Sequence, residues 1–120
     1  MSNINVHFKV TGAEVNPKKL PVFSRHPVNW HFVSNDPDIK RVGIVFHESE
    51  CQFFPGCTPP NQCERQLDYH GGGSAFTTIY GTAPEHDDPI PKECEYTVYG
   101  YRTSGGKEIA DPMILVTKEP

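Results

Sequence analysis

Two alternating apolar runs, separated by a polar loop, constrain the fold of this chain more than any other feature. Residues 28–32 carry apolar side chains at every second position, with Trp30 in the middle, and residues 42–46 repeat the spacing. A spacing of two places these side chains on one face of a β-strand. Both runs are rich in β-branched and aromatic residues, which suit a half-buried sheet. The sequence therefore predicts the middle of a β-sandwich, with Trp30 as an anchor of its core.

Further segments of strand character cover most of the remaining chain. They are residues 4–10, 13–15, 20–23, 75–80, 94–101 and 112–117. Pro21 would restrict the segment around it to an edge strand or an extended arm. Twelve prolines and ten glycines among 120 residues favour many turns, and no segment requires a helix. We therefore expect an all-β chain: one domain, residues 1–120, folded as a Greek-key β-sandwich of seven or eight strands.

Two long connections interrupt this pattern. Residues 48–74 show no apolar period and are predicted to form a loop that contains three of the four cysteines. A loop of this length in a compact domain is usually functional, cross-linked or both. Residues 81–92 form a second predicted loop, which is rich in proline and acidic residues. Because loops on rigid scaffolds carry recognition, these two segments are the predicted contact surfaces.

The order of these signals resembles the cupredoxin-like fold, a sandwich related in architecture to immunoglobulin-like domains. The resemblance lies in four pieces that follow the opening alternating strand. They are Val28-Asn29-Trp30, Ile44-Val45-Phe46, Tyr96-Thr97-Val98, and Asp111-Pro112 with the apolar residues that follow it. The resemblance implies that the second and third of these strands lie side by side and antiparallel. All four cysteines would then gather at one end of the sandwich.

The resemblance does not extend to a blue-copper centre, which needs two histidines, a cysteine thiolate and usually a methionine. Where the family pattern places its first histidine, this chain has Lys40-Arg41-Val42. Where the pattern places the other ligands, this chain has Tyr99-Gly100-Tyr101-Arg102. Met113 is present, but no cysteine precedes it at the required strand end. The expectation is a cupredoxin-like domain that lacks the electron-transfer site and needs no cofactor.

The four cysteines suit two kinds of chemistry. Two disulfides would tether the long loop, with Cys51–Cys57 and Cys63–Cys94 as one pairing and the other two pairings open. The alternative is a zinc or copper site that combines these thiolates with His47 or His70. The spacing of five residues between successive cysteines of the loop is not that of a zinc knuckle, and free thiols are the third possibility. Disulfides would indicate a periplasmic or secreted protein, whereas free or metal-bound thiols would indicate the cytoplasm.

Six histidines are many for this length, and His7, His31 and His47 are predicted to face outward from their strands. They are either ordinary surface residues or ligands that converge on a metal. The aromatic residues Tyr99 and Tyr101 are also expected on an outer face. Aromatic side chains often anchor interfaces, so four side chains are predicted to contact a partner. They are Phe53, Phe54, His70 and Tyr80.

Several function classes are disfavoured by composition and motif. The net charge of −4 lacks the basic stripe of nucleic-acid-binding proteins. No apolar run is long enough to span a bilayer. The run Gly71-Gly72-Gly73 is not followed by the residues of a phosphate loop, and neither Ser74 nor Ser104 lies in a nucleophile elbow. The sequence therefore predicts a non-enzymatic binding or structural module with a protein partner, and metal binding is the alternative.

Overall fold

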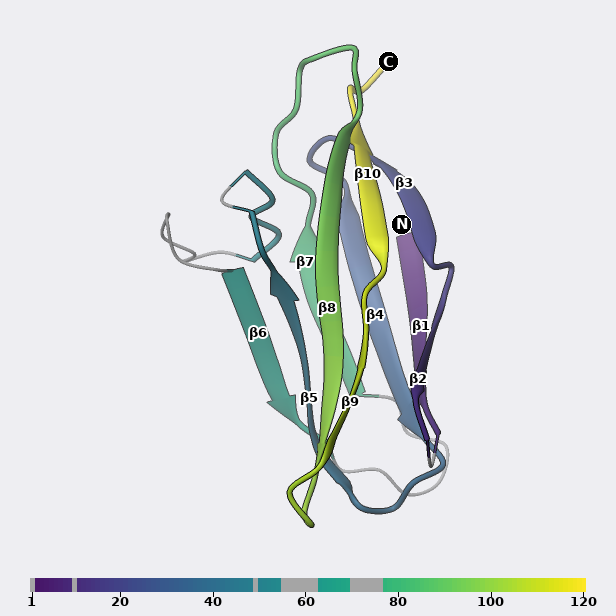
Figure 1. Ribbon diagram of the computed structural model, residues 1–120. Coiled ribbons are helices and arrows are strands. Elements are labelled where there is room, and N and C mark those ends of the chain that lie inside the picture. Colours follow the sequence, from purple (N-terminus) through teal and green to yellow (C-terminus); the bar gives the residue numbers. More distant parts are fainter. Residues whose placement is uncertain (1, 10, 49, 55–62, 70–76) are drawn as a thin grey trace.

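The computed structural model describes residues 2–9, 11–48, 50–54, 63–69 and 77–120, which form two β-sheets packed face to face (Figure 1). These residues contain ten strands and no helix, so the predicted all-β class and its sandwich arrangement are confirmed. The strands are β1 (Ser2–Phe8), β2 (Ala13–Asn16), β3 (Lys19–Phe23), β4 (Pro27–Ser34), β5 (Ile39–Phe46), β6 (Cys63–Asp68), β7 (Thr77–Thr82), β8 (Lys92–Arg102), β9 (Lys107–Ala110) and β10 (Met113–Thr117).

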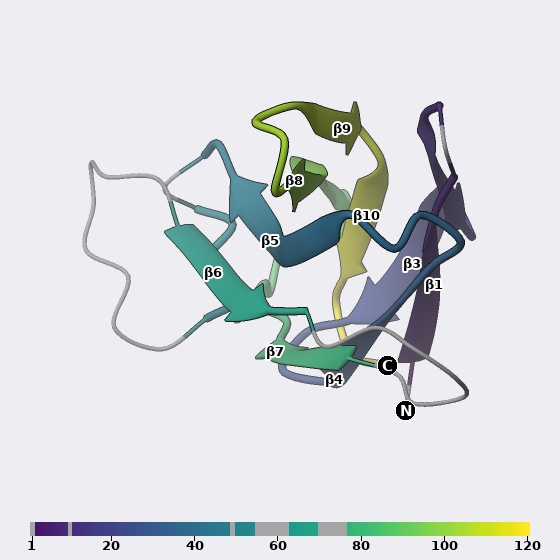
Figure 2. The same ribbon diagram turned by 90° about the horizontal axis from the view of Figure 1, so that it is seen from below.

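Both sheets mix parallel and antiparallel pairs. The first sheet has the strand order β2-β1-β4-β7, and β1 runs parallel to β4. The second has the order β3-β10-β8-β5-β6, and β3 runs parallel to β10. The short strand β9 pairs with the end of β8, while β10 pairs with its beginning. Seen from below, the two sheets lie as separate layers, with β4 and β7 in one layer and β5 and β8 in the other (Figure 2).

Two strands, β6 and β9, lie where the sequence did not predict them, which raises the number above the seven or eight expected. In β6 only the first residue, Cys63, is buried, so the strand has no apolar alternation that could reveal it. It lies at the edge of its sheet and pairs with β5. The 48–74 segment is therefore not one continuous loop, because backbone pairing makes a strand within it.

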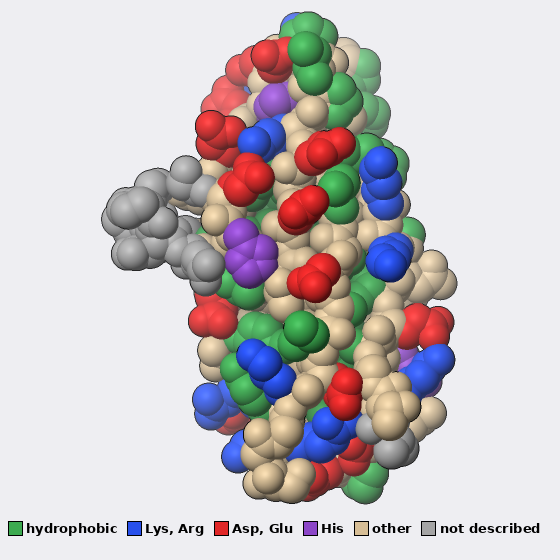
Figure 3. Space-filling view, in the orientation of Figure 1, with side chains coloured by type: hydrophobic (Ala, Val, Ile, Leu, Met, Phe, Trp, Pro, Cys, Tyr) green, Lys and Arg blue, Asp and Glu red, His purple; other side chains and the backbone are tan. Residues whose placement is uncertain are grey.

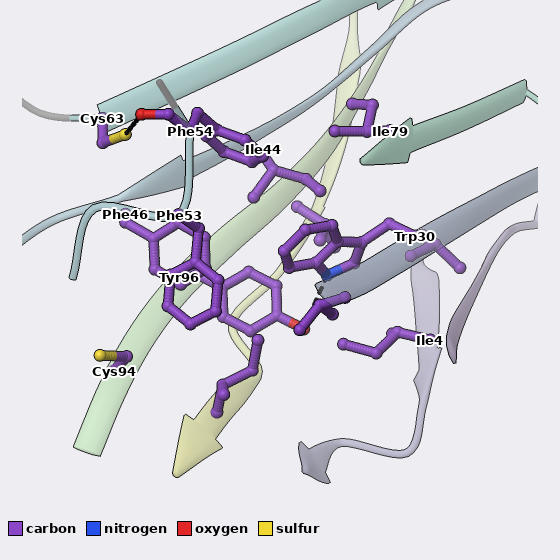
Figure 4. Close-up of a cluster of buried hydrophobic side chains, with 14 of the residues drawn as sticks. Ile4, Trp30, Ile44, Phe46, Phe53, Phe54, Cys63, Ile79, Cys94 and Tyr96 are labelled. Atoms are coloured by element: carbon purple, nitrogen blue, oxygen red, sulfur yellow. Dashed lines mark hydrogen bonds between the residues drawn. The ribbon is translucent and has the colours of Figure 1, made fainter. Parts of the chain in front are cut away.

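An aromatic cluster fills the core between the sheets, and the fully buried Trp30 lies at its centre (Figure 4). The indole ring has its centroid about 6 Å from those of four other aromatic rings. These are the rings of Phe46, Phe53, Phe54 and Tyr96. The Trp30 Nε1–H group donates a hydrogen bond to the Tyr96 hydroxyl at 3.2 Å, which satisfies both buried polar groups. The role predicted for Trp30 is therefore confirmed.

Tyr99 faces outward from the second sheet, as predicted, but it lies flat on the strands and is only 4% exposed. The ring crosses Gly43 so closely that a Cβ atom there would clash with the ring carbon Cζ. Only glycine leaves room for this arrangement. The hydroxyl reaches β6, where it donates a hydrogen bond of 2.6 Å to Glu64 Oε2. Tyr99 thus links β8 to β6 across β5.

Alkaline pH is expected to destabilise the protein through Tyr99. Burial, together with the hydrogen bond to Glu64, raises the pKa of Tyr99 above its ordinary value of 10.0. The unfolded chain loses this proton near pH 10 while the folded protein keeps it, so stability falls as pH rises. Between pH 9 and pH 11 the loss of unfolding free energy in Tyr99→Phe should be smaller than in the wild type by about 1 kcal/mol. Urea denaturation at both pH values measures this, and equal losses in the two proteins would contradict it.

Candidate functional site

A buried disulfide joins Cys51, which follows β5, to Cys94 near the start of β8. The register of β5 and β8 places Phe46 opposite Tyr96, so the chain beyond β5 leaves the sheet beside Cys94. The adjacency of these strands is as predicted. The pairing Cys51–Cys57 with Cys63–Cys94 is wrong, because the strand register brings Cys51 and Cys94 together, with their Cα atoms 5.8 Å apart.

Cys63 lies at the same end of the sandwich, opposite Phe46 in the pairing of β5 with β6, and it too is disulfide-bonded. A disulfide sulfur is no longer a thiolate and cannot ligate zinc or copper as one. Cys51, Cys63 and Cys94 are therefore excluded as the thiolate ligands of the alternative metal site. Cys57 and His70, which were also assigned to it, lie outside the described residues.

His31 and His47 are hydrogen-bonded at separate places in the fold. The His47 Nε2 atom lies 2.8 Å from Thr97 Oγ1, and the Thr97 hydroxyl donates to Asp111 Oδ1 at 2.7 Å. His31 lies on the outer face of the other sheet and contacts Thr78 and Asn3 through its two ring nitrogens. Within the described ranges, no group of three or more metal-ligating side chains converges.

Residues 50–54 cross from the second sheet to the edge of the first and close one end of the core. Phe53 and Phe54 are 1% and 3% exposed, and the Phe53 carbonyl accepts a hydrogen bond from the backbone N–H of Thr82 at 2.9 Å. The prediction that these two phenylalanines contact a partner is wrong, because the aromatic cluster around Trp30 buries both. Their role is to hold the chain after β5 against β7.

The connection between β7 and β8, residues 83–91, lies at this same end and is fixed by hydrogen bonds (Figure 1). The Ser24 hydroxyl accepts the backbone N–H of His86 at 2.8 Å, and the His26 carbonyl accepts that of Ala83 at 2.9 Å. Within the loop, the Asp88 side chain accepts the backbone N–H of Ile90 at 2.9 Å. His86 Nε2 lies 2.7 Å from the Ile90 carbonyl oxygen. The loop is thus held by the body of the sandwich and by its own side chains.

The two most exposed large apolar side chains of the described residues lie in and near this loop. Ile90 is 74% exposed near the end of the 83–91 loop, between two prolines. Tyr80 is 69% exposed on β7, on the outer face of the first sheet, so it remains available as the contact residue that was predicted. Ile90 was not singled out from the sequence. The signal that could have found it is an apolar residue between prolines in an otherwise acidic loop.

The end of the sandwich around the 83–91 loop carries most of the negative charge. Acidic side chains gather over the upper half of the face shown in Figure 3, where β8 begins. The acidic residues at this end are Glu48, Glu50, Glu85, Asp87, Asp88, Glu93, Glu95 and Glu119. The basic ones are Lys19, Arg25, Lys92 and Lys118. We call this end, with the 83–91 loop, the acidic pole.

Lys92 holds two of these carboxylates in place. Its Nζ atom lies 2.7 Å from Glu48 Oε2 and 3.1 Å from Glu50 Oε2. The hydrogen bond to Glu48, followed by that to Glu50, raises the pKa of the Lys92 ammonium. Arg25 contacts Glu85 and Glu119 at longer distances, 3.5 and 3.4 Å. Since the carboxylates outnumber the cations, the pole keeps a net negative charge and can attract a basic partner.

In the part of the chain that the structure describes, no helix has the length and apolar character needed to cross a membrane. Comparisons with known proteins assign no family to the chain. No protein-family model matches the sequence, and a search of curated proteins finds no match. Function is therefore inferred from the geometry of the acidic pole and of the opposite end of the sandwich.

Proposed function

We propose that this protein is a non-enzymatic, cupredoxin-like binding domain with Greek-key connections, which recognises a protein partner through the 83–91 loop. Support for the fold comes from the pairing of β5 with β8, which are adjacent and antiparallel as the resemblance requires. The cysteines of the described residues also lie at one end of the sandwich, as the resemblance implies. The proposal assigns the scaffold to the two sheets and recognition to the connection between β7 and β8.

The observation that carries the proposal is the presentation of Ile90 by an ordered loop. Ile90 is 74% exposed, so its burial against a partner would stabilise the complex through the hydrophobic effect. Hydrogen bonds that the loop's backbone N–H groups donate to Ser24, His26 and Asp88 hold the loop in one conformation before binding. A preorganised loop loses little conformational entropy on association, so more of the contact energy remains as affinity.

The charge around Ile90 indicates the kind of partner. Asp87 and Asp88 precede Ile90 in the loop, and they belong to the excess of carboxylates at the acidic pole. A basic protein surface with an apolar pocket would match this arrangement, and its association would slow as salt screens the charges. The disulfides suit an oxidising compartment, so we place the protein in the periplasm or outside the cell.

The test uses two exposed isoleucines as a matched pair. A photo-crosslinking amino acid is placed at Ile90 or, as the control, at Ile109 of β9, which is 49% exposed outside the acidic pole. The source cells are irradiated, and the partner that crosslinks through position 90 is identified and purified. Its affinity is then measured for Ile90→Ser and Ile109→Ser. We expect Ile90→Ser to weaken binding by about tenfold or more and Ile109→Ser by less than about twofold.

The affinity measurements decide between this proposal and its rivals. Raising the salt concentration should slow association with the wild type, and Asp87→Asn with Asp88→Asn should reduce that salt dependence. Equal effects of the two serine variants would show that the 83–91 loop is not the contact surface. A crosslink through position 109 but not through position 90 would assign recognition to the other end.

A further inference from the structure

We propose that an open cavity at the end of the sandwich opposite the acidic pole binds the phosphate or sulfate group of a small molecule. The cavity has a volume of about 360 Å³ and lies where β5 begins and β8 ends. It is lined by Lys40, Arg41, Gln66, Tyr101, Arg102 and Gly105. Three of these residues are cations, and none of the described residues that line the cavity is acidic. The cavity is separate from the surface proposed for the protein partner, so either proposal can fail without the other.

A β-bulge brings two of the cations to the same side of the sheet. In the pairing of β5 with β8, Ile39 lies opposite Arg102 and Arg41 opposite Tyr101, so Lys40 is an extra residue without its own partner position. A bulge of this kind breaks the strand alternation and redirects a side chain. The burial pattern shows the result, because Lys40 and Arg41 are both exposed in succession. A regular strand would have placed them on opposite faces.

The charges at the cavity differ in how far they are already neutralised. Arg102 is fixed in the wall, with its side chain 15% exposed and ion pairs to Asp36 at 2.6 Å and Glu108 at 2.9 Å. Arg41 is half exposed and contacts Asp68 at 3.6 Å, which is a loose pair. Among the described residues, no carboxylate lies within ion-pair distance of the Lys40 ammonium. Lys40 and Arg41 are therefore the charges that an incoming anion would meet.

The other lining groups suit an anion with several oxygen atoms. Gln66 supplies an amide and Tyr101 a hydroxyl, while Arg41 can offer two parallel N–H groups to neighbouring oxygens. Phosphate and sulfate present three or four acceptor oxygens, so they can use an ammonium, a guanidinium and a neutral donor together. Lys107 lies against the ring of Tyr101, with its Nζ atom 5.8 Å from the ring centroid, and adds positive potential nearby. The volume accommodates such a group with a small body attached.

Isothermal titration calorimetry at low salt tests the site directly. The ligands are inorganic pyrophosphate, glucose 6-phosphate and glucose 6-sulfate, and the last two separate a phosphate from a sulfate on the same sugar. We expect binding to the wild type, and affinity for the preferred ligand about tenfold or more weaker in Lys40→Gln/Arg41→Gln. The control Lys19→Gln/Lys118→Gln removes two exposed cations elsewhere and has the same net charge. It should bind within about twofold of the wild type.

A third variant tests the site by raising its expected affinity for the anion. Asp68→Asn removes the carboxylate that contacts Arg41, so it should bind the anion more tightly than the wild type. Amide chemical shifts should move at the lining residues on addition of the ligand, while Ile90 stays unchanged. The proposal is overturned if none of the three ligands binds, or if the control weakens binding as much as Lys40→Gln/Arg41→Gln. Unchanged affinity in the latter variant, with its fold confirmed by circular dichroism, would overturn it as well.

Discussion

Replacing Cys51 and Cys94 together with alanine is expected to lower the free energy of unfolding by about 4 kcal/mol. The disulfide joins residues 43 positions apart, so it removes much of the conformational freedom of the unfolded chain. Both side chains are fully buried, and truncation also takes packing away beside the aromatic cluster. Urea denaturation followed by circular dichroism gives the unfolding free energy of the variant and of the wild type.

Hydrogen exchange shows where the stability is lost. The backbone N–H of Thr82 bonds to the carbonyl of Phe53, two residues after Cys51, so its protection should fall most among the amides of β7. The control is Met113→Ala, a truncation in β10, which should leave the exchange of Thr82 unchanged relative to its neighbours. A loss below about 1 kcal/mol in the double alanine variant would contradict the prediction, since other contacts would then hold residues 50–54 against β7.

Replacing Trp30 with alanine is expected to cost about 3–5 kcal/mol. The side chain is fully buried, and its loss leaves a cavity bounded by the aromatic rings around it. The Tyr96 hydroxyl also loses its partner and becomes a buried polar group without a hydrogen bond. The unfolding free energy is measured with urea by circular dichroism, because Trp30 is the single tryptophan and its fluorescence disappears with it.

A surface control and a double-mutant cycle of Trp30→Phe with Tyr96→Phe separate packing from hydrogen bonding. Tyr80→Ala removes a large aromatic side chain that is 69% exposed, so its cost should stay within about 0.5 kcal/mol. Trp30→Phe keeps an aromatic ring but leaves Tyr96 without its donor, and Trp30→Phe/Tyr96→Phe removes both polar groups. The double variant should therefore lose less stability than the sum of the two single losses. Equal costs for Trp30→Ala and Tyr80→Ala would contradict a core centred on Trp30.

Strands with one buried face could be predicted because burial imposes its period on the residues. In β4 and β5 the apolar positions around Trp30 and Ile44 alternate with others as the pleat alternates. Strand β6 could not be predicted in this way, since almost all of its side chains are exposed and its stability comes from backbone pairing with β5. The bulge at Lys40 also leaves no periodic pattern in the sequence, and only the register of β5 against β8 reveals it.

In the loops between strands, the sequence does not show which apolar side chains are buried and which are exposed. Phe53 and Phe54 resemble contact residues in a segment without a pattern, but the three-dimensional path of residues 50–54 buries them against Trp30. Ile90 is the opposite case. An apolar residue in a loop could equally have been buried in the core, but Ile90 is exposed. A short segment carries no period long enough to decide between the two, and burial there depends on what the rest of the fold leaves uncovered.

The all-β class and the central position of Trp30 could be predicted from the sequence alone, and the cupredoxin-like order of its patterns implied the neighbouring strands that lead to Cys51 and Cys94. Each of these follows from a local pattern repeated along a strand, or from the order of such patterns. The three-dimensional fold was needed to show which sulfurs meet, which phenylalanines are buried and which cations share a cavity. These depend on register between strands distant in sequence, and a shift of one residue exchanges the inner for the outer face.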